Sequence, residues 1–115
     1  MYDSRLMLRA AVAGALDGNE TGAFKEFGPM GAPLVLLVHI PQAEGTSPTL
    51  DITFDESTDG VNADGPVHTM AQITEAGPQK FPLRMGRGSQ FLRFAAVTGG
   101  SSPDFGVVEI GPVFV

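Results

Sequence analysis

The sequence predicts an all-β fold, an antiparallel sandwich of two sheets with about eight strands and a jelly-roll-like architecture. Three observations predict it: regularly spaced breaks, short apolar segments between them, and a six-residue pattern that occurs twice. The 115 residues include 15 Gly and nine Pro, which are distributed along the chain and not gathered in one linker. Such punctuation between short apolar segments is typical of β proteins. Residues 6–16 are compatible with a helix, but Gly14 weakens this assignment.

Two of the expected strands indicate which faces of the sheets are buried. In residues 49–56, Leu50, Ile52 and Phe54 alternate with polar residues, which predicts one buried face and one solvent-facing face. In residues 34–40 both faces are apolar, which predicts cover on both sides, either by loops of the same chain or by a neighbouring subunit. The complete set of expected strands is 11–16, 22–27, 34–40, 49–56, 68–74, 79–84, 90–98 and 105–114.

The repeated pattern is G-T-S-P-T-L at residues 45–50 and G-S-S-P-D-F at residues 100–105. Each copy follows one apolar segment and precedes another. Glycine permits the positive φ of a tight turn, and proline keeps the residue before it out of the helical region. We therefore expect two similar hairpin loops at the same end of the sandwich.

Composition excludes several classes of function. The net charge is -6 and the seven basic residues form no cluster, so we expect no nucleic-acid partner. The absence of cysteine excludes disulfides, thiolate nucleophiles and zinc–thiolate sites. Arg5 and Arg9 interrupt the apolar core that a signal peptide would need, and the longest apolar run, 33–38, is too short for a membrane helix. We expect a soluble protein with no cofactor, consisting of an N-terminal arm (1–10) and one β-sandwich domain (11–115).

Catalytic and metal-binding signals are weak. His39 and His68 coexist with many Ser and Asp residues, but no G-x-S-x-G motif is present, so we do not expect an enzyme. Residues 55–60, D-E-S-T-D-G, resemble the first half of a calcium loop. Pro66 stands where that loop requires a bidentate Glu, and Asp-Gly is a common turn dipeptide. The pattern favours a solvated acidic turn, with calcium binding left open.

Two binding modes remain. The G-R-G segment at 86–88 lies between two expected strands, so Arg87, with Arg84 nearby, forms a basic turn that can contact an acidic partner surface. Carbohydrate recognition usually needs exposed Trp or Tyr, and the chain has no Trp and a single Tyr. Its eight Phe residues mostly occupy alternating strand positions that the core explains.

Several of these segments, taken in order, resemble one known family. They are the opening R-L-x-L at 5–8, G-T-S-P-T-L-D-I-T-F at 45–54, the D-G turn at 59–60, F-L-R-F at 91–94 and G-S-S-P-D-F at 100–105. In this order and spacing they resemble the small head decoration proteins, or cement proteins, of tailed phages. The family often carries an aromatic residue on the turn after the acidic pair, whereas residues 61–67 contain none.

The resemblance implies a jelly-roll homotrimer on the outer capsid surface of a virion, made in the host cytoplasm. Its partner would be the major capsid protein, whose neighbouring subunits it would clamp against the pressure of internal DNA. It implies no catalytic residues. The alternative is a receptor- or carbohydrate-binding jelly-roll module of a phage tail or fibre. For the decoration function, apolar side chains would bury area and arginines would pair with carboxylates. The residues expected at this interface are Tyr2, Arg5, Leu6, Leu8, Arg9, Arg84 and Arg87.

Overall fold

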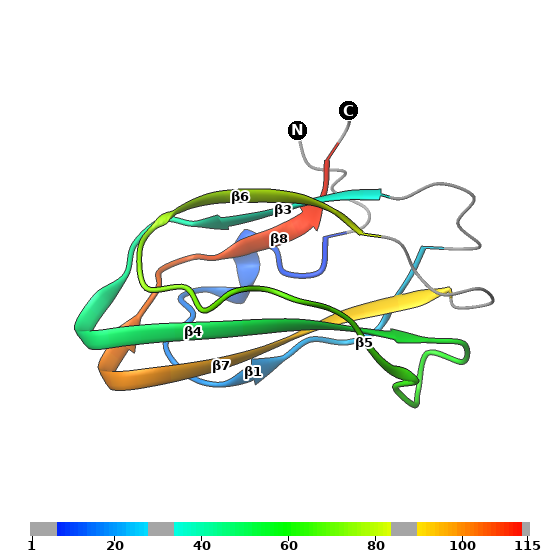
Figure 1. Cartoon of the computed structure of the whole chain (residues 1–115), viewed down its shortest axis with the longest axis horizontal. Helices are drawn as coiled ribbons and strands as arrows, with labels where there is room; N and C mark the ends of the chain where they lie inside the picture. The colour runs from blue at the N-terminus through cyan, green and yellow to red at the C-terminus, as the bar shows by residue number, and fades with distance from the viewer. Residues whose placement is uncertain (1–6, 28–33, 84–89, 114–115) are drawn as a thin grey trace.

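The computed structural model describes residues 7–27, 34–83 and 90–113. These residues form eight strands in two antiparallel sheets stacked face to face (Figure 1), which confirms the predicted all-β sandwich. A short 3-10 turn, η2 (Ala11–Ala13), precedes them. The strands are β1 (Glu20–Thr21), β2 (Lys25–Glu26), β3 (Leu34–Ile40), β4 (Glu44–Ser57), β5 (Gly65–Thr69), β6 (Gly77–Leu83), β7 (Phe91–Asp104) and β8 (Glu109–Pro112).

The larger sheet has the strand order β1-β7-β4-β5, with β2 also paired to β7, and the smaller sheet has the order β6-β3-β8. Strands β1 and β2 pair with successive parts of β7, so they form one edge strand that is interrupted at residues 22–24. The chain crosses between the sheets from β2 to β3, from β3 to β4, from β5 to β6, from β6 to β7 and from β7 to β8. This repeated crossing places successive segments of the chain in opposite layers of the sandwich.

The core lies between the two sheets. As the alternation predicts, Leu50, Ile52 and Phe54 of β4 are each 0% exposed, while the polar residues between them are half-buried on the opposite face. An aromatic stack joins the sheets at one side of the core. The ring of His68 in β5 lies 4.3 Å from the ring of Phe81 in β6, and Phe54 lies 5.7 Å from Phe81. Burial of these large side chains supplies the main stabilising term of the fold.

The repeated pattern forms a bend that β4 and β7 share. The two copies face each other, with Thr46 paired to Ser101, and the register shifts on both sides of this pair. Gly45 and Gly100 have φ of 112° and 93°, and the two serines that precede the prolines both have φ of 50°. At the left of Figure 1 the two strands turn together towards the other sheet, which is how bulged strands form the corners of a sandwich. Their location at the same end is confirmed, but the expected hairpin loops are wrong because the copies pair with each other.

Other expected strands need correction. Residues 11–16 are not a strand: Gly14, with φ of 78°, ends the 3-10 turn, and Val12 is 95% exposed. The strand expected at 68–74 corresponds to β5, which ends at residue 69, and Ile73 forms an isolated bridge to Leu50. The strand expected at 105–114 corresponds to β8, which begins only at Glu109. Residues 105–108 form a loop, in which Phe105 donates its backbone N–H to the carbonyl of Leu16, outside either sheet. The strand at 34–40 is confirmed, and those at 49–56, 79–84 and 90–98 correspond to β4, β6 and β7 with changed bounds.

Candidate interaction surface

The segment that leads into the first turn is part of the sandwich. Leu8 is 8% exposed and donates its backbone N–H to the carbonyl of Ile110 at 2.8 Å. Arg9 forms an isolated bridge with Ile110, in which each backbone N–H donates to the other residue's carbonyl, with N to O distances of 3.0 and 2.9 Å. The sandwich therefore begins before residue 10, earlier than the sequence predicts.

Arg9 is the most buried charged residue of the described chain, at 2% exposure. Its Nε and Nη2 donate to the two carboxylate oxygens of Glu20 at 2.8 and 3.2 Å. Its Nη1 donates to the carbonyls of Gly14 and Val108 at 2.9 and 2.8 Å. Such a bidentate pair with further carbonyl acceptors satisfies a guanidinium that has lost its water.

The interface expected at Leu8 and Arg9 therefore needs correction. Both side chains are used inside the domain, Leu8 in the core and Arg9 in the ion pair with Glu20, so they are not presented to a partner. Sequence reasoning missed this because it treats arginine as a surface residue. The apolar residues on both sides of Arg9 were the available signal. The other interface residues predicted from sequence, Tyr2, Arg5, Leu6, Arg84 and Arg87, lie outside the described residues and stay a prediction.

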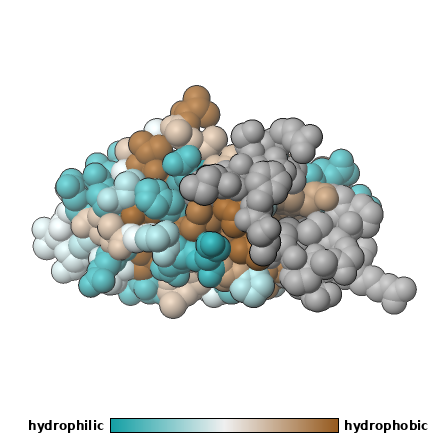
Figure 2. Space-filling model, turned by 90° about the horizontal axis from the view of Figure 1, so that it is seen from above, coloured by the Kyte–Doolittle hydropathy of each residue, from teal (hydrophilic) through white to brown (hydrophobic). Residues whose placement is uncertain are grey.

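The outer face of the smaller sheet carries apolar side chains that the core does not use. We define this outer face as Val35, Leu37, His39, Pro78, Lys80 and Pro82. Val35 and Leu37 are half-buried, in contrast to Leu36 and Val38, which are 0% exposed on the inner side of the same strand. Lys80 and the two prolines are exposed and lie opposite the β3 residues in register. Figure 2 looks onto this side of the molecule and shows hydrophobic surface between hydrophilic regions.

Residues 58–64 form the acidic turn that follows β4. Asp59 Oδ1 accepts the backbone N–H groups of Val61 and Asn62 at 2.8 and 2.9 Å, and its Oδ2 accepts the Asn62 side-chain amide at 3.2 Å. These hydrogen bonds, led by the Asn62 backbone, hold the pKa of Asp59 well below its usual value. The carboxylate of Asp55 points elsewhere and pairs with Arg93 at 3.1 Å. Asp59 therefore stabilises the turn itself, whereas Asp55 is paired with Arg93 of β7.

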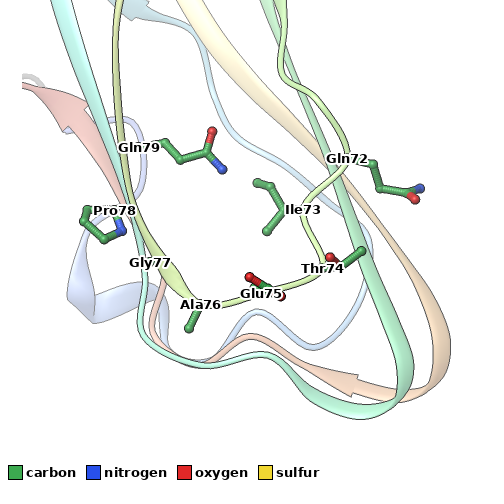
Figure 3. Close-up of a pocket in the computed structure, with 8 residues that line it drawn as sticks. All are labelled: Gln72, Ile73, Thr74, Glu75, Ala76, Gly77, Pro78 and Gln79. Atoms are coloured by element: carbon green, nitrogen blue, oxygen red, sulfur yellow. The ribbon is translucent and has the colours of Figure 1, made fainter.

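Neither histidine lines the surface depression that adjoins β6. His68 stacks on Phe81, and His39 belongs to the outer face. The depression, of about 290 Å³, lies between the loop 72–76 and the start of β6. Figure 3 shows Ile73 and Gln79 pointing into it; none of its lining residues is aromatic or a histidine. Among the residues described, no group of three or more His, Asp or Glu side chains is placed to hold a metal ion.

Comparisons with known proteins add no relative. A scan against protein-family models finds no match, and a search of curated proteins likewise finds none. No helix within the described ranges is long and apolar enough to cross a membrane.

Proposed function

We propose that this chain is a structural head decoration protein, which binds the outer face of a viral capsid as a homotrimer and stabilises contacts between major capsid subunits. The observation that carries this proposal is the outer face of the smaller sheet. Val35 and Leu37 place apolar area on the side of β3 that the core does not cover, and prolines from β6 extend that surface. Apolar area bordered by polar residues is typical of protein–protein contacts. The resemblance of its sequence segments, in their order, to those of decoration proteins supplies the kind of partner.

The alternative, a receptor- or carbohydrate-binding module, has less support. Every phenylalanine in the described part of the chain is buried or half-buried, and the depression beside β6 has no aromatic lining. A sugar site normally needs such a stacking surface. A catalytic function is likewise not proposed, because neither histidine lines that depression.

The outer face is tested with capsids prepared without this protein. The variant Val35→Gln/Leu37→Gln should bind these capsids at least about tenfold more weakly than the wild type, because apolar contact area is lost. Val97→Gln is the matched control, since Val97 is 53% exposed on the outer side of the larger sheet. Co-sedimentation measures binding, and thermal melting verifies the fold. Equal binding by the face variant and the control would remove the outer face from the mechanism.

The N-terminal segment is tested separately. Deletion of residues 1–6 retains Leu8 and Arg9, which the fold needs, and removes Tyr2, Arg5 and Leu6. We expect this deletion to weaken capsid binding and to leave the melting temperature nearly unchanged. Unchanged binding would exclude the segment from the interface. Failure of the full-length chain to bind capsids at all would contradict the decoration function itself.

A further inference from the structure

Strand β6 forms one edge of the smaller sheet, and no other described strand pairs with its far side. An exposed edge strand presents unpaired N–H and C=O groups that can pair with a strand from another chain. The sequence of β6 is G-P-Q-K-F-P-L, with prolines at positions 78 and 82. Their effect depends on which way their backbone groups point.

The hydrogen bonds of β3 fix this direction. The carbonyl of Val35 accepts the N–H of Val113 at 3.0 Å, so the backbone groups of Val35 point towards the β8 side of the sheet. In an antiparallel sheet the N–H and C=O of one residue point the same way, and directions alternate along the strand. Val35 is the register partner of Pro82. This pair is therefore not hydrogen-bonded, and the backbone groups of Pro82 point away from β3.

By the same alternation, the backbone groups of Lys80 and Pro78 also point away from β3, as those of Pro82 do. Of these three outward positions, Lys80 alone has an N–H, because proline lacks one. If two copies of β6 met antiparallel about Lys80, three outward donors per strand would give six inter-strand hydrogen bonds. The prolines at 78 and 82 of both strands remove four of these donors. The two remaining bonds would place the lysines of the two copies directly opposite each other, which is repulsive.

The other edge of this sheet has a similar arrangement. The N–H of Ile110 in β8 donates to the carbonyl of Arg9 at 2.9 Å, so the backbone groups of Ile110 point outward from β3. The next residue with this direction is Pro112, which has no N–H to offer. On this edge, therefore, the outward N–H of Ile110 is already bonded to Arg9, and the next outward position, Pro112, has no N–H.

We infer that Pro78, Lys80 and Pro82 close the β6 edge against pairing with a second copy of this chain. Contacts of the smaller sheet with other proteins are then made by side chains of its outer face and not by strand addition. Edge prolines and lysines are a known means of preventing edge-to-edge association.

The test replaces the prolines in the full chain. Pro78 and Pro82 are exposed, so threonine at both positions adds two donors per strand without leaving a cavity. We expect Pro78→Thr/Pro82→Thr to self-associate at least about tenfold more tightly than the wild type in sedimentation velocity. Adding Lys80→Thr should strengthen association further. Gln79→Thr is the matched control, since the backbone of residue 79 points towards β3 and its substitution opens no edge.

Register is tested by a single cysteine, which is possible because the chain has no other. In the double proline variant, Lys80→Cys should form a disulfide between two copies, because directly paired Cα atoms lie within disulfide reach. Gln79→Cys in the same background, and Lys80→Cys with both prolines kept, should not. The inference would be overturned if the folded double variant sedimented like the wild type. It would also be overturned if Lys80→Cys cross-linked equally well with the prolines kept and with them replaced. If the double variant does not fold, each single substitution restores one donor per strand and carries the same test.

Discussion

Arg9 connects parts of the chain that are far apart in sequence: the segment before η2, Gly14, Glu20 and the loop before β8. Its side chain is 1% exposed, whereas that of Glu20 is 35% exposed. This difference makes the carboxylate the more informative partner to change. Removing it leaves a buried cation without its counter-charge.

We expect Glu20→Gln to lower the free energy of unfolding by about 2 kcal/mol, somewhat less than for a fully buried pair because Glu20 is partly exposed. Urea denaturation measures the change. Glu26→Gln is the control, since Glu26 is exposed on the neighbouring strand β2 and its change should stay within about 0.5 kcal/mol. Equal effects of the two substitutions would show that the Arg9 pair contributes no more than a surface charge.

Asp59 makes stability depend on pH in acid. Its pKa in the folded chain lies below the usual 3.8, so its contribution is complete above about pH 4 and is lost as the pH falls further. The folded state should therefore lose stability more steeply below pH 4 in the wild type than in Asp59→Asn, which cannot titrate at this position. Urea denaturation at neutral pH and in acid compares the two proteins. Parallel pH profiles would mean that the hydrogen bonds to Asp59 do not persist in solution.

At the scale of elements, the shared bend of β4 and β7 depends on two glycines. A Cβ on Gly45 would lie 2.6 Å from the carbonyl oxygen of Ser102, and a Cβ on Gly100 would lie 2.5 Å from that of Ser47. Both glycines also have positive φ. These obstacles are backbone atoms of the paired strand, so no side-chain rotation relieves them.

Either Gly45→Ala or Gly100→Ala should therefore lower the free energy of unfolding by at least about 2 kcal/mol. Gly18→Ala is the control, because no atom lies within 4 Å of a Cβ there and its φ is not in the positive range. Denaturant midpoints give the comparison. A neutral effect at Gly100 would show that the bend can open without loss of the fold.

The sequence predicts well those strands whose hydrophobic pattern reflects burial in the core and nothing else. Strand β3 is bracketed by Pro33 and Pro41 and is apolar except at His39, so its bounds are predicted correctly. The extensions of β4 and β7 are missed because G-T-S-P and G-S-S-P have the composition of turns. Pairing between residues so far apart provides the hydrogen bonds that local sequence cannot indicate. For the same reason the burial of Arg9 depends on Glu20 and Val108, which lie in other segments.

At the scale of the molecule, both sheets share one core, which contains Leu36 and Val38 of β3 together with Ile52 and Phe54 of β4. We therefore expect the sheets to unfold as one unit. Native-state hydrogen exchange should give the same opening free energy for the central amides of β3 and β4. A lower value for β3 would identify the smaller sheet as a separate unfolding unit.

The β4–β7 ladder also determines how fast this chain can fold. It pairs residues 34 positions apart at one end, Ser57 with Phe91, and 60 positions apart at the other, Glu44 with Asp104. Closing such loops loses chain entropy before the ladder returns any bonding energy. Refolding from denaturant is therefore expected in milliseconds to seconds, as for other proteins dominated by non-local pairing. Until that closure occurs, β4 and β7 stay unpaired with each other, so refolding at low protein concentration should favour the native protein over aggregation.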